Sequence, residues 1–165
     1  MSLVIKAKAE ILEIITQAMQ NFEQIDPPSW NKKPNRSTWS KKELLGHLID
    51  SASNNLRRFI VAQYEQGTKI IYDQDKWVDY QNYQAQEIDD LKLLWKLLNH
   101  QIAHVIGQIP QSKLDFTVDT GRGKVELHSL VYFIEDYIVH LKYHLNQLVD
   151  PAFNIDQIEH KLTNN

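Results

Sequence analysis

Cysteine is absent from the 165-residue chain, and glycine and proline occur only five times each. Without cysteine the protein can form no disulfide, no thiolate metal site and no cysteine nucleophile. No apolar run approaches the roughly 18 residues of a membrane span, and there is no signal-peptide hydrophobic segment. These absences predict a soluble, cytoplasmic protein that does not act on membranes.

Both signs of charge are interspersed along the chain. The net charge is −3, and no block of lysine or arginine exceeds two residues. Proteins that bind nucleic acids usually carry a basic stripe, so we expect no nucleic-acid partner. Hydrophobic residues make up 42% of the chain, which is enough for a full core. We therefore expect a single domain over residues 1–165.

Four stretches have apolar residues at spacings of three and four, the period of an amphipathic helix. They cover about residues 3–22, 40–66, 87–108 and 129–150. The second begins with a capping box, SKKE at residues 40–43, and Gly67 offers its C-terminal stop. The buried stripe of the third is predicted to be Leu91, Leu94, Leu98, Ile102, Val105 and Ile109.

Two long connections separate these helices. Residues 68–87 are typical of a crossover, a lid or a binding loop. Residues 110–128 contain the turn signal DTGRGK and leave room for a short hairpin, although no stretch shows a convincing strand pattern. The sequence therefore predicts an all-α four-helix bundle. The long connections argue against a simple up-down-up-down arrangement.

The last helix carries two histidines inside its apolar stripe. His140 and His144, in DYIVHLKYHLNQL (residues 136–148), are one helical turn apart. Their Cβ atoms should be about 5–6 Å apart, so both imidazoles could bind one metal ion at about 2.0–2.1 Å. The alternatives are a hydrogen-bonded core pair, or a slightly rotated helix that exposes both rings.

His47 favours the metal interpretation. The face of the second helix on which it lies becomes polar further along, at Ser51, Asn54 and Arg58. His47 is about 10 Å from the start of its helix, and His140 and His144 are about 12 and 6 Å from the end of theirs. If the two helices are antiparallel neighbours, the three rings meet at one level. Three nitrogen ligands leave coordination positions open, as in catalytic metal sites.

The other four histidines are not expected to join this site. His100 and His104 repeat the spacing, but they lie off the apolar stripe of the third helix, so we interpret them as boundary or surface residues. His128 precedes the last helix and His160 lies in a polar tail. The chain contains neither the Glu-x-x-His pairs of di-iron bundles nor the HExxH motif of zincins.

Three segments resemble the DinB/YfiT-like superfamily, in the same order along nearly the whole chain. They are WSKKELLGHLIDSASNNLRRF (residues 39–59), YDQDKWVDYQ (72–81) and DYIVHLKYHLNQL (136–148). The resemblance implies a four-helix bundle with up-down-down-up topology, and a homodimer. It also implies a divalent metal, commonly zinc or nickel, bound by three histidines. By motif match these are His47, His140 and His144.

Four other residues are candidates for supporting or substrate-binding roles. Glu43 and Asp136 each lie one turn before a predicted ligand and could hold its imidazole tautomer; the alternative for each is a solvated surface carboxylate. Asn54 and Arg58 could reach an anionic or polar substrate, or form a buried polar network between helices. Gln147 matches the family motif and could form a hydrogen bond at the end of the bundle.

Three functions compete. The first is a divalent-metal-dependent enzyme acting on a small molecule, either a hydrolase or a transferase that uses a low-molecular-weight thiol, as the resemblance implies. The metal would act as a Lewis acid on bound water or thiol, and any thiol must arrive as a cosubstrate because the chain has none. The alternatives are a non-catalytic metal-binding or sensor module, and a helical interaction protein whose histidines are structural.

Overall fold

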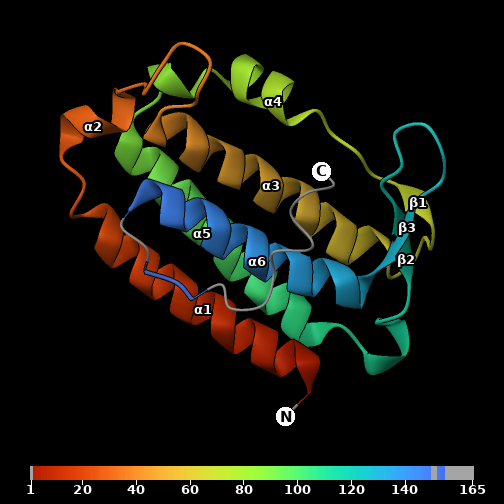
Figure 1. Cartoon of the computed structure of the whole chain (residues 1–165). Helices are drawn as coiled ribbons and strands as arrows, with labels where there is room; N and C mark the ends of the chain where they lie inside the picture. Colours follow the sequence, from red (N-terminus) through yellow and green to blue (C-terminus); the bar gives the residue numbers. More distant parts are fainter. Residues whose placement is uncertain (1, 150–151, 155–165) are drawn as a thin grey trace.

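Four long helices dominate the computed structural model, which describes residues 2–149 and 152–154 (Figure 1). They are α1 (Leu3–Phe22), α3 (Lys41–Val61), α5 (Ile88–Gln108) and α6 (Leu130–Leu148). Helices α1 and α3 each pack against both α5 and α6, so the four contacts close a ring around the core. The mostly helical architecture expected from the sequence is confirmed. Within the described residues, no helix has the length and apolarity needed to cross a membrane.

Helices α3 and α6 lie side by side and run in opposite directions. Lys41, at the start of α3, donates to the carbonyl of Leu148 at the end of α6. At the other end, the guanidinium of Arg58 lies 5.0 Å from the ring centroid of Phe133, early in α6. This antiparallel pairing brings the first half of α3 beside the second half of α6.

The capping box predicted for α3 is present. The Ser40 hydroxyl accepts from the Glu43 amide at 3.1 Å, and the Glu43 carboxylate accepts from the Ser40 amide at 2.8 Å. The helix ends at Val61 rather than at residue 66. It ends early because the chain turns toward a small sheet, where the amide of Gly67, at φ 76°, donates to the Thr117 carbonyl.

A three-stranded sheet joins the two long connections, and the all-α expectation missed it. Strand β1 (Thr68–Lys69) pairs in parallel with β2 (Thr117–Asp119), which pairs antiparallel with β3 (Leu127–Ser129). Strands of two or three residues are too short to show an alternating pattern in the sequence. The β2–β3 pair is the short hairpin for which the sequence left room.

The first long connection folds over the outer side of α3 (Figure 1). It contains α4 (Gln74–Gln81) and the 3₁₀ turn η1 (Tyr83–Ala85). The Tyr83 ring packs on Gly46, where a Cβ would lie 2.1 Å from a ring carbon. Its hydroxyl donates to Asp50 at 2.6 Å. Glycine at position 46 therefore makes room for the ring that fastens this connection to α3.

The buried face of α5 differs from the predicted stripe. Trp95 and Asn99 are fully buried, whereas Leu94 is 44% exposed. Asn99 tolerates burial because its amide donates to the Trp95 carbonyl at 2.8 Å and its oxygen accepts from the Tyr137 hydroxyl at 2.6 Å. A stripe chosen by hydrophobicity alone followed the leucines and missed this buried polar pair. The remaining short elements are α2 (Pro27–Asn31) and η2 (Gln111–Lys113).

Candidate metal centre

Three histidines meet between α3 and α6. One ring nitrogen from each of His47, His140 and His144 lies within 4.8 Å of the other two. The ring centroids are 5.1, 4.8 and 4.5 Å apart for the pairs 47–140, 47–144 and 140–144. The antiparallel α3–α6 pairing therefore brings to one level the three rings that the sequence analysis selected.

The spacing of two of these nitrogens suits a shared metal ion. Two nitrogens bound at about 2.0–2.1 Å, at angles between tetrahedral and octahedral, lie about 2.9–3.4 Å apart. The Nε2 atoms of His47 and His140 are 3.1 Å apart. A hydrogen bond between two neutral rings would explain that one distance, but it would not explain why the third ring turns to the same point.

The outer nitrogens indicate how the rings are held. Nδ1 of His144 lies 2.8 Å from the amide oxygen of Gln147, which can only accept, so this nitrogen carries the proton and Nε2 keeps its lone pair. Nδ1 of His140 lies 3.4 Å from the Ser51 hydroxyl. Nδ1 of His47 is buried without a hydrogen-bond partner among the described residues. The Nε2 lone pair of His144 is therefore free for a metal, and the same tautomer would free those of His140 and His47.

Burial keeps the three imidazoles neutral. His47 is only 1% exposed, and burial, with a smaller contribution from the charge of His144, lowers its pKa to about 3. Burial also lowers the pKa of His140 well below its ordinary value, and that of His144 to a lesser extent. Neutral rings are the form that binds metals, so all three are ready to bind at pH 7.

Trp39 covers one side of the centre, a contact that the sequence analysis missed. Its ring lies against that of His47, with centroids 5.0 Å apart and planes tilted by 31°. Trp39 immediately precedes the helix cap Ser40, a position that indicates packing but does not reveal the target. Ser51 was also recognised only as a polar position on the helix face, not as a partner of His140.

The two acidic candidates contact other groups. Besides capping α3, the Glu43 carboxylate forms a 2.7 Å ion pair with Lys33. The charge of Asp136 acts on Arg58 and Tyr132. The nearest hydrogen-bond partners of the His140 and His144 outer nitrogens are instead neutral, a hydroxyl and an amide oxygen.

Asn54 and Arg58 lie in a polar network along α3. Asn54 is buried and donates to the Asp50 carbonyl at 2.9 Å. Arg58 donates to the Asn55 side chain and to the Ile70 carbonyl, both at 3.2 Å. Burial lowers the pKa of Arg58, and its charge contributes, after burial and the other two histidines, to lowering the pKa of His140.

The remaining described histidines lie away from the centre. His100 and His104 are exposed on α5, as expected. His128 stacks on Tyr132, with ring centroids 4.2 Å apart. His160 lies outside the described residues.

Comparison with known proteins identifies the family. The family model of the DinB superfamily matches residues 12–148. The chain belongs to the DinB superfamily. This confirms the family predicted from the three sequence segments. No curated protein matches the chain.

Two solved structures have a similar fold. YfiT from Bacillus subtilis, described as a probable metal-dependent hydrolase with an unusual four-helix bundle topology, superposes with a TM-score of 0.79 at 16% identity, over 90% of this chain and 86% of that one. A histidine-to-alanine variant of the mycothiol-dependent maleylpyruvate isomerase superposes with a TM-score of 0.72 at 9% identity, over 89% of this chain and 61% of that one. At these identities the likeness shows the fold alone.

Proposed function

We propose that the protein is a divalent-metal-dependent enzyme whose three-histidine centre acts on a small molecule, either as a hydrolase or as a transferase that uses a low-molecular-weight thiol. The observation that carries this proposal is the convergence of three neutral imidazoles, one buried and two half-buried, from two helices on one point. Histidines that served only as packing would not need to direct their nitrogens toward a common point. A metal-binding sensor without turnover is the alternative.

The residues of the centre have separate roles in this proposal. His47, His140 and His144 would hold the ion through Nε2 and leave coordination positions open. When bound, the ion supplies Lewis acidity that lowers the pKa of a water or thiol ligand. Gln147 and Ser51 orient two of the imidazoles through their outer nitrogens, and Trp39 keeps water from one side of His47.

The thiol-dependent reaction has its own support. One of the similar structures is an isomerase that depends on mycothiol, and the chain contains no cysteine that could supply a thiol from within. A thiol would therefore enter as a cosubstrate and be converted to the nucleophilic thiolate at the centre. The hydrolase alternative takes its support from the description of YfiT.

Four other candidates act as supports in this proposal. Glu43 fixes the start of α3, and with it the position of His47, through the capping box. The charge of Arg58 disfavours a protonated His140 ring, and the charge of Asp136 acts on Arg58. For Asn54, which donates to the Asp50 carbonyl, we propose a support of α3 beside the centre. A direct contact between Arg58 and an anionic substrate is the second role that we propose for this residue.

Several expectations from the resemblance stay proposals. We propose zinc or nickel as the metal, a homodimer, a single domain over residues 1–165 and a cytoplasmic location, without nucleic-acid or membrane partners. We also propose the up-down-down-up topology. It is supported by the antiparallel α3–α6 contacts above, by the Lys42 ammonium at the start of α3, which donates to the Gln86 carbonyl just before α5, and by the Lys92–Glu23 ion pair, which joins the start of α5 to the end of α1.

Turnover by the metal-loaded protein tests the proposal. The purified protein is loaded with zinc or nickel and assayed for ester and amide hydrolysis, and for conjugation of a small thiol to electrophiles. We expect turnover in one of these assays that disappears after chelation and in His140→Ala, but not in His104→Ala. Stoichiometric metal binding without turnover in any assay would favour the sensor alternative.

A further inference from the structure

The outer side of α5 carries an exposed apolar patch. It is formed by Leu93, Leu94 and Leu97, whose exposed fractions are 52, 44 and 56%. The opposite side of the helix is buried against α1 and α3, so these three leucines are not part of the bundle core. Single exposed leucines are common on protein surfaces, but a continuous apolar patch is typical of an interaction site.

Polar residues continue this patch toward both ends of the helix. At about 100° per residue, Asp90, His100, Gln101 and His104 all lie within about 60° of Leu97 around the helix axis, and all four are exposed. Together with the three leucines they make up the α5 face. In the part of the chain that the structure describes, the side chains of Asp90 and His104 have neither an ion pair nor a hydrogen bond. The α5 face therefore has an apolar centre and a polar rim, as protein interfaces do.

The order of residues along the α5 face suits a second copy of the same chain. In a twofold-symmetric pair of antiparallel helices with Leu97 on the axis, each residue faces the one equally far beyond position 97. Asp90 and His104, each seven positions from Leu97, then face each other at both ends of the pair. The imidazole donates an N–H in either charge state, and the carboxylate accepts it. Leu97 meets its own counterpart, and the other two leucines face positions 100 and 101.

A parallel pair would leave the polar ends of the α5 face unmatched. It would oppose Asp90 to its own counterpart, and like charges opposite each other are unfavourable at an interface. It would also leave both histidines without the acceptor that Asp90 provides. The antiparallel pair of identical helices instead matches an acid with an imidazole at both ends and places leucine at the centre. The charge pattern therefore favours a second copy as the occupant.

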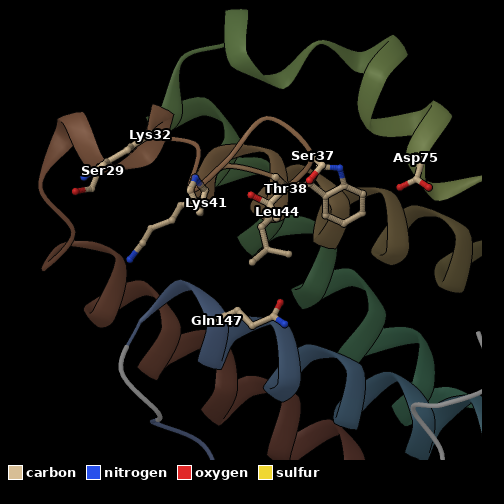
Figure 2. A pocket seen from close by; sticks show the side chains of 10 residues that line it. Ser29, Lys32, Ser37, Thr38, Lys41, Leu44, Asp75 and Gln147 are labelled. Atoms are coloured by element: carbon tan, nitrogen blue, oxygen red, sulfur yellow. The ribbon is translucent and has the colours of Figure 1, made fainter.

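The α5 face is separate from the metal centre. Helix α5 packs against α1 and α3 and lies across the bundle from α6, which carries His140 and His144. A groove of about 860 Å³ lies beside Trp39 and Gln147, which contact two of the histidines (Figure 2). Helix α5 supplies none of the described residues that line this groove. Docking along α5 therefore uses no residue of the groove.

We infer that the α5 face binds the same face of a second copy, in an antiparallel pair with Leu97 on the twofold axis. The homodimer proposed above rests on the family resemblance, whereas this inference assigns its surface and its register from the arrangement of residues on α5. It requires neither bound metal nor turnover, because the α5 face and the metal centre share no residue.

Sedimentation velocity of the full chain tests the surface, once with metal removed by a chelator and once after loading with zinc. We expect a concentration-dependent dimer in both conditions. Leu97→Glu opposes two carboxylates on the axis and should raise the dimer Kd at least about tenfold. Ile5→Glu, at a 45% exposed position on α1, is the control and should dimerise like the wild type. Circular dichroism verifies that both variants keep the helical fold.

Charge exchange tests the register. His104→Glu sets a second carboxylate against Asp90, and Asp90→Lys removes the acceptor that faces His104. Because the contact occurs twice in the dimer, each single variant should dimerise about three- to tenfold more weakly. The double variant Asp90→Lys, His104→Glu restores opposite charges across the axis and should recover most of the lost affinity. Two single losses that add up in the double variant would overturn the antiparallel register.

Disulfide formation gives a second measure of the axis, since the chain has no cysteine of its own. Packed helices whose axes are 8–10 Å apart bring facing Cα atoms within the roughly 4.4–6.8 Å that a disulfide requires. Leu97→Cys should therefore form a covalent dimer under mild oxidation by dioxygen. Leu127→Cys, at a position of similar exposure on β3, should remain mostly monomeric on a non-reducing gel. Equal cross-linking of the two variants would contradict an axis at Leu97.

The outcomes separate this inference from the proposed function. A dimer that is unaffected by Leu97→Glu overturns the α5 face while a homodimer through another surface stands. A wild-type chain that stays monomeric at all concentrations overturns the inference and the homodimer together. Neither result bears on the metal centre, which is tested by metal content and turnover.

Discussion

The Nε2 atoms of His47 and His140 lie 3.1 Å apart, although the two residues are separated by 93 positions in the sequence. The contact depends on the antiparallel packing of α3 and α6. The gap between the two nitrogens is too short to hold a water molecule. Both nitrogens lie close to a ring nitrogen of His144. An ion between these three nitrogens would bind all three rings and link the two helices.

Metal binding should therefore stabilise the fold. A ligand that binds only the native state, at 100 times its Kd, raises the free energy of unfolding by about 2.7 kcal/mol. We expect Zn²⁺ or Ni²⁺ to raise the Tm of the chelated protein by several degrees. The same addition to His144→Ala should have little effect, whereas His104→Ala should respond like the wild type. Thermal unfolding followed by circular dichroism measures both.

Gln147 should matter for metal affinity, although it is not a ligand. Its amide oxygen faces Nδ1 of His144 at 2.8 Å, and loss of such a partner typically weakens metal binding about 10- to 100-fold. We expect this loss in Gln147→Ala and near-normal affinity in Gln147→Glu, whose carboxylate still accepts. Gln101→Ala, at an exposed position on α5, is the control. Competition with a chromophoric chelator gives the affinities, and equal affinity in all variants would rule out this role.

Asp50 should give the stability a characteristic pH dependence. Burial raises its pKa from 3.8 to about 6, against the opposing hydrogen bonds from Tyr83 and Gln81. Because the folded state binds this proton more tightly than the unfolded state, Asp50 loses its stabilising effect as the pH rises from about 4 through 6. The lowered pKa values of the three histidines act in the opposite sense, since they destabilise the fold as the pH falls below about 6.5.

Asp50→Asn isolates the carboxylate from the histidines. The measurements are made in the presence of a metal chelator. The free energy of unfolding of the variant minus that of the wild type should increase by about 1–3 kcal/mol between pH 4 and 8. Urea denaturation across this range measures the difference. The exposed control Asp115→Asn should show no comparable trend, and a flat difference for Asp50→Asn would refute a raised pKa at this position.

Gly46 should not tolerate a side chain. A Cβ at this position would lie 2.1 Å from a carbon of the Tyr83 ring, and overpacking of this kind costs about 1–3 kcal/mol. We expect Gly46→Ala to destabilise the protein in urea despite the better helix propensity of alanine. Gly123→Ala, whose Cβ would meet nothing within 4 Å, should stay close to wild type. Equal stability of the two variants would show that Tyr83 moves freely.

The sequence predicted the helix limits best where local signals and the pattern of burial agree. The limits of α1 agree with the structure because one apolar stripe runs through the whole helix. The capping box located the start of α3 because it depends on residues three positions apart. The end of α3 and the small sheet were not predictable in the same way, since they depend on a bond between Gly67 and Thr117, 50 positions away.

The three histidines of the candidate site could be selected from the sequence, but the residues that contact them could not. A face that turns polar inside an amphipathic helix is visible in the sequence, and it selected His47. The contacts of Trp39 and Ser51 depend on the rotation of α3 against α6, which no local pattern records. For the same reason Glu43 and Asp136, chosen by their spacing on one helix, have their clearest partners elsewhere.

Metal content of five single variants tests the central claim most directly. Each purified protein is loaded with zinc, dialysed and analysed for bound metal, with circular dichroism to verify its fold. We expect His47→Ala, His140→Ala and His144→Ala to lose stoichiometric metal while remaining helical, because two nitrogens hold an ion poorly and the rest of the core is unchanged. His100→Ala and His104→Ala should bind one equivalent, as the wild type does. Full metal content in the first three variants, or its loss in the last two, would contradict a metal centre at His47, His140 and His144.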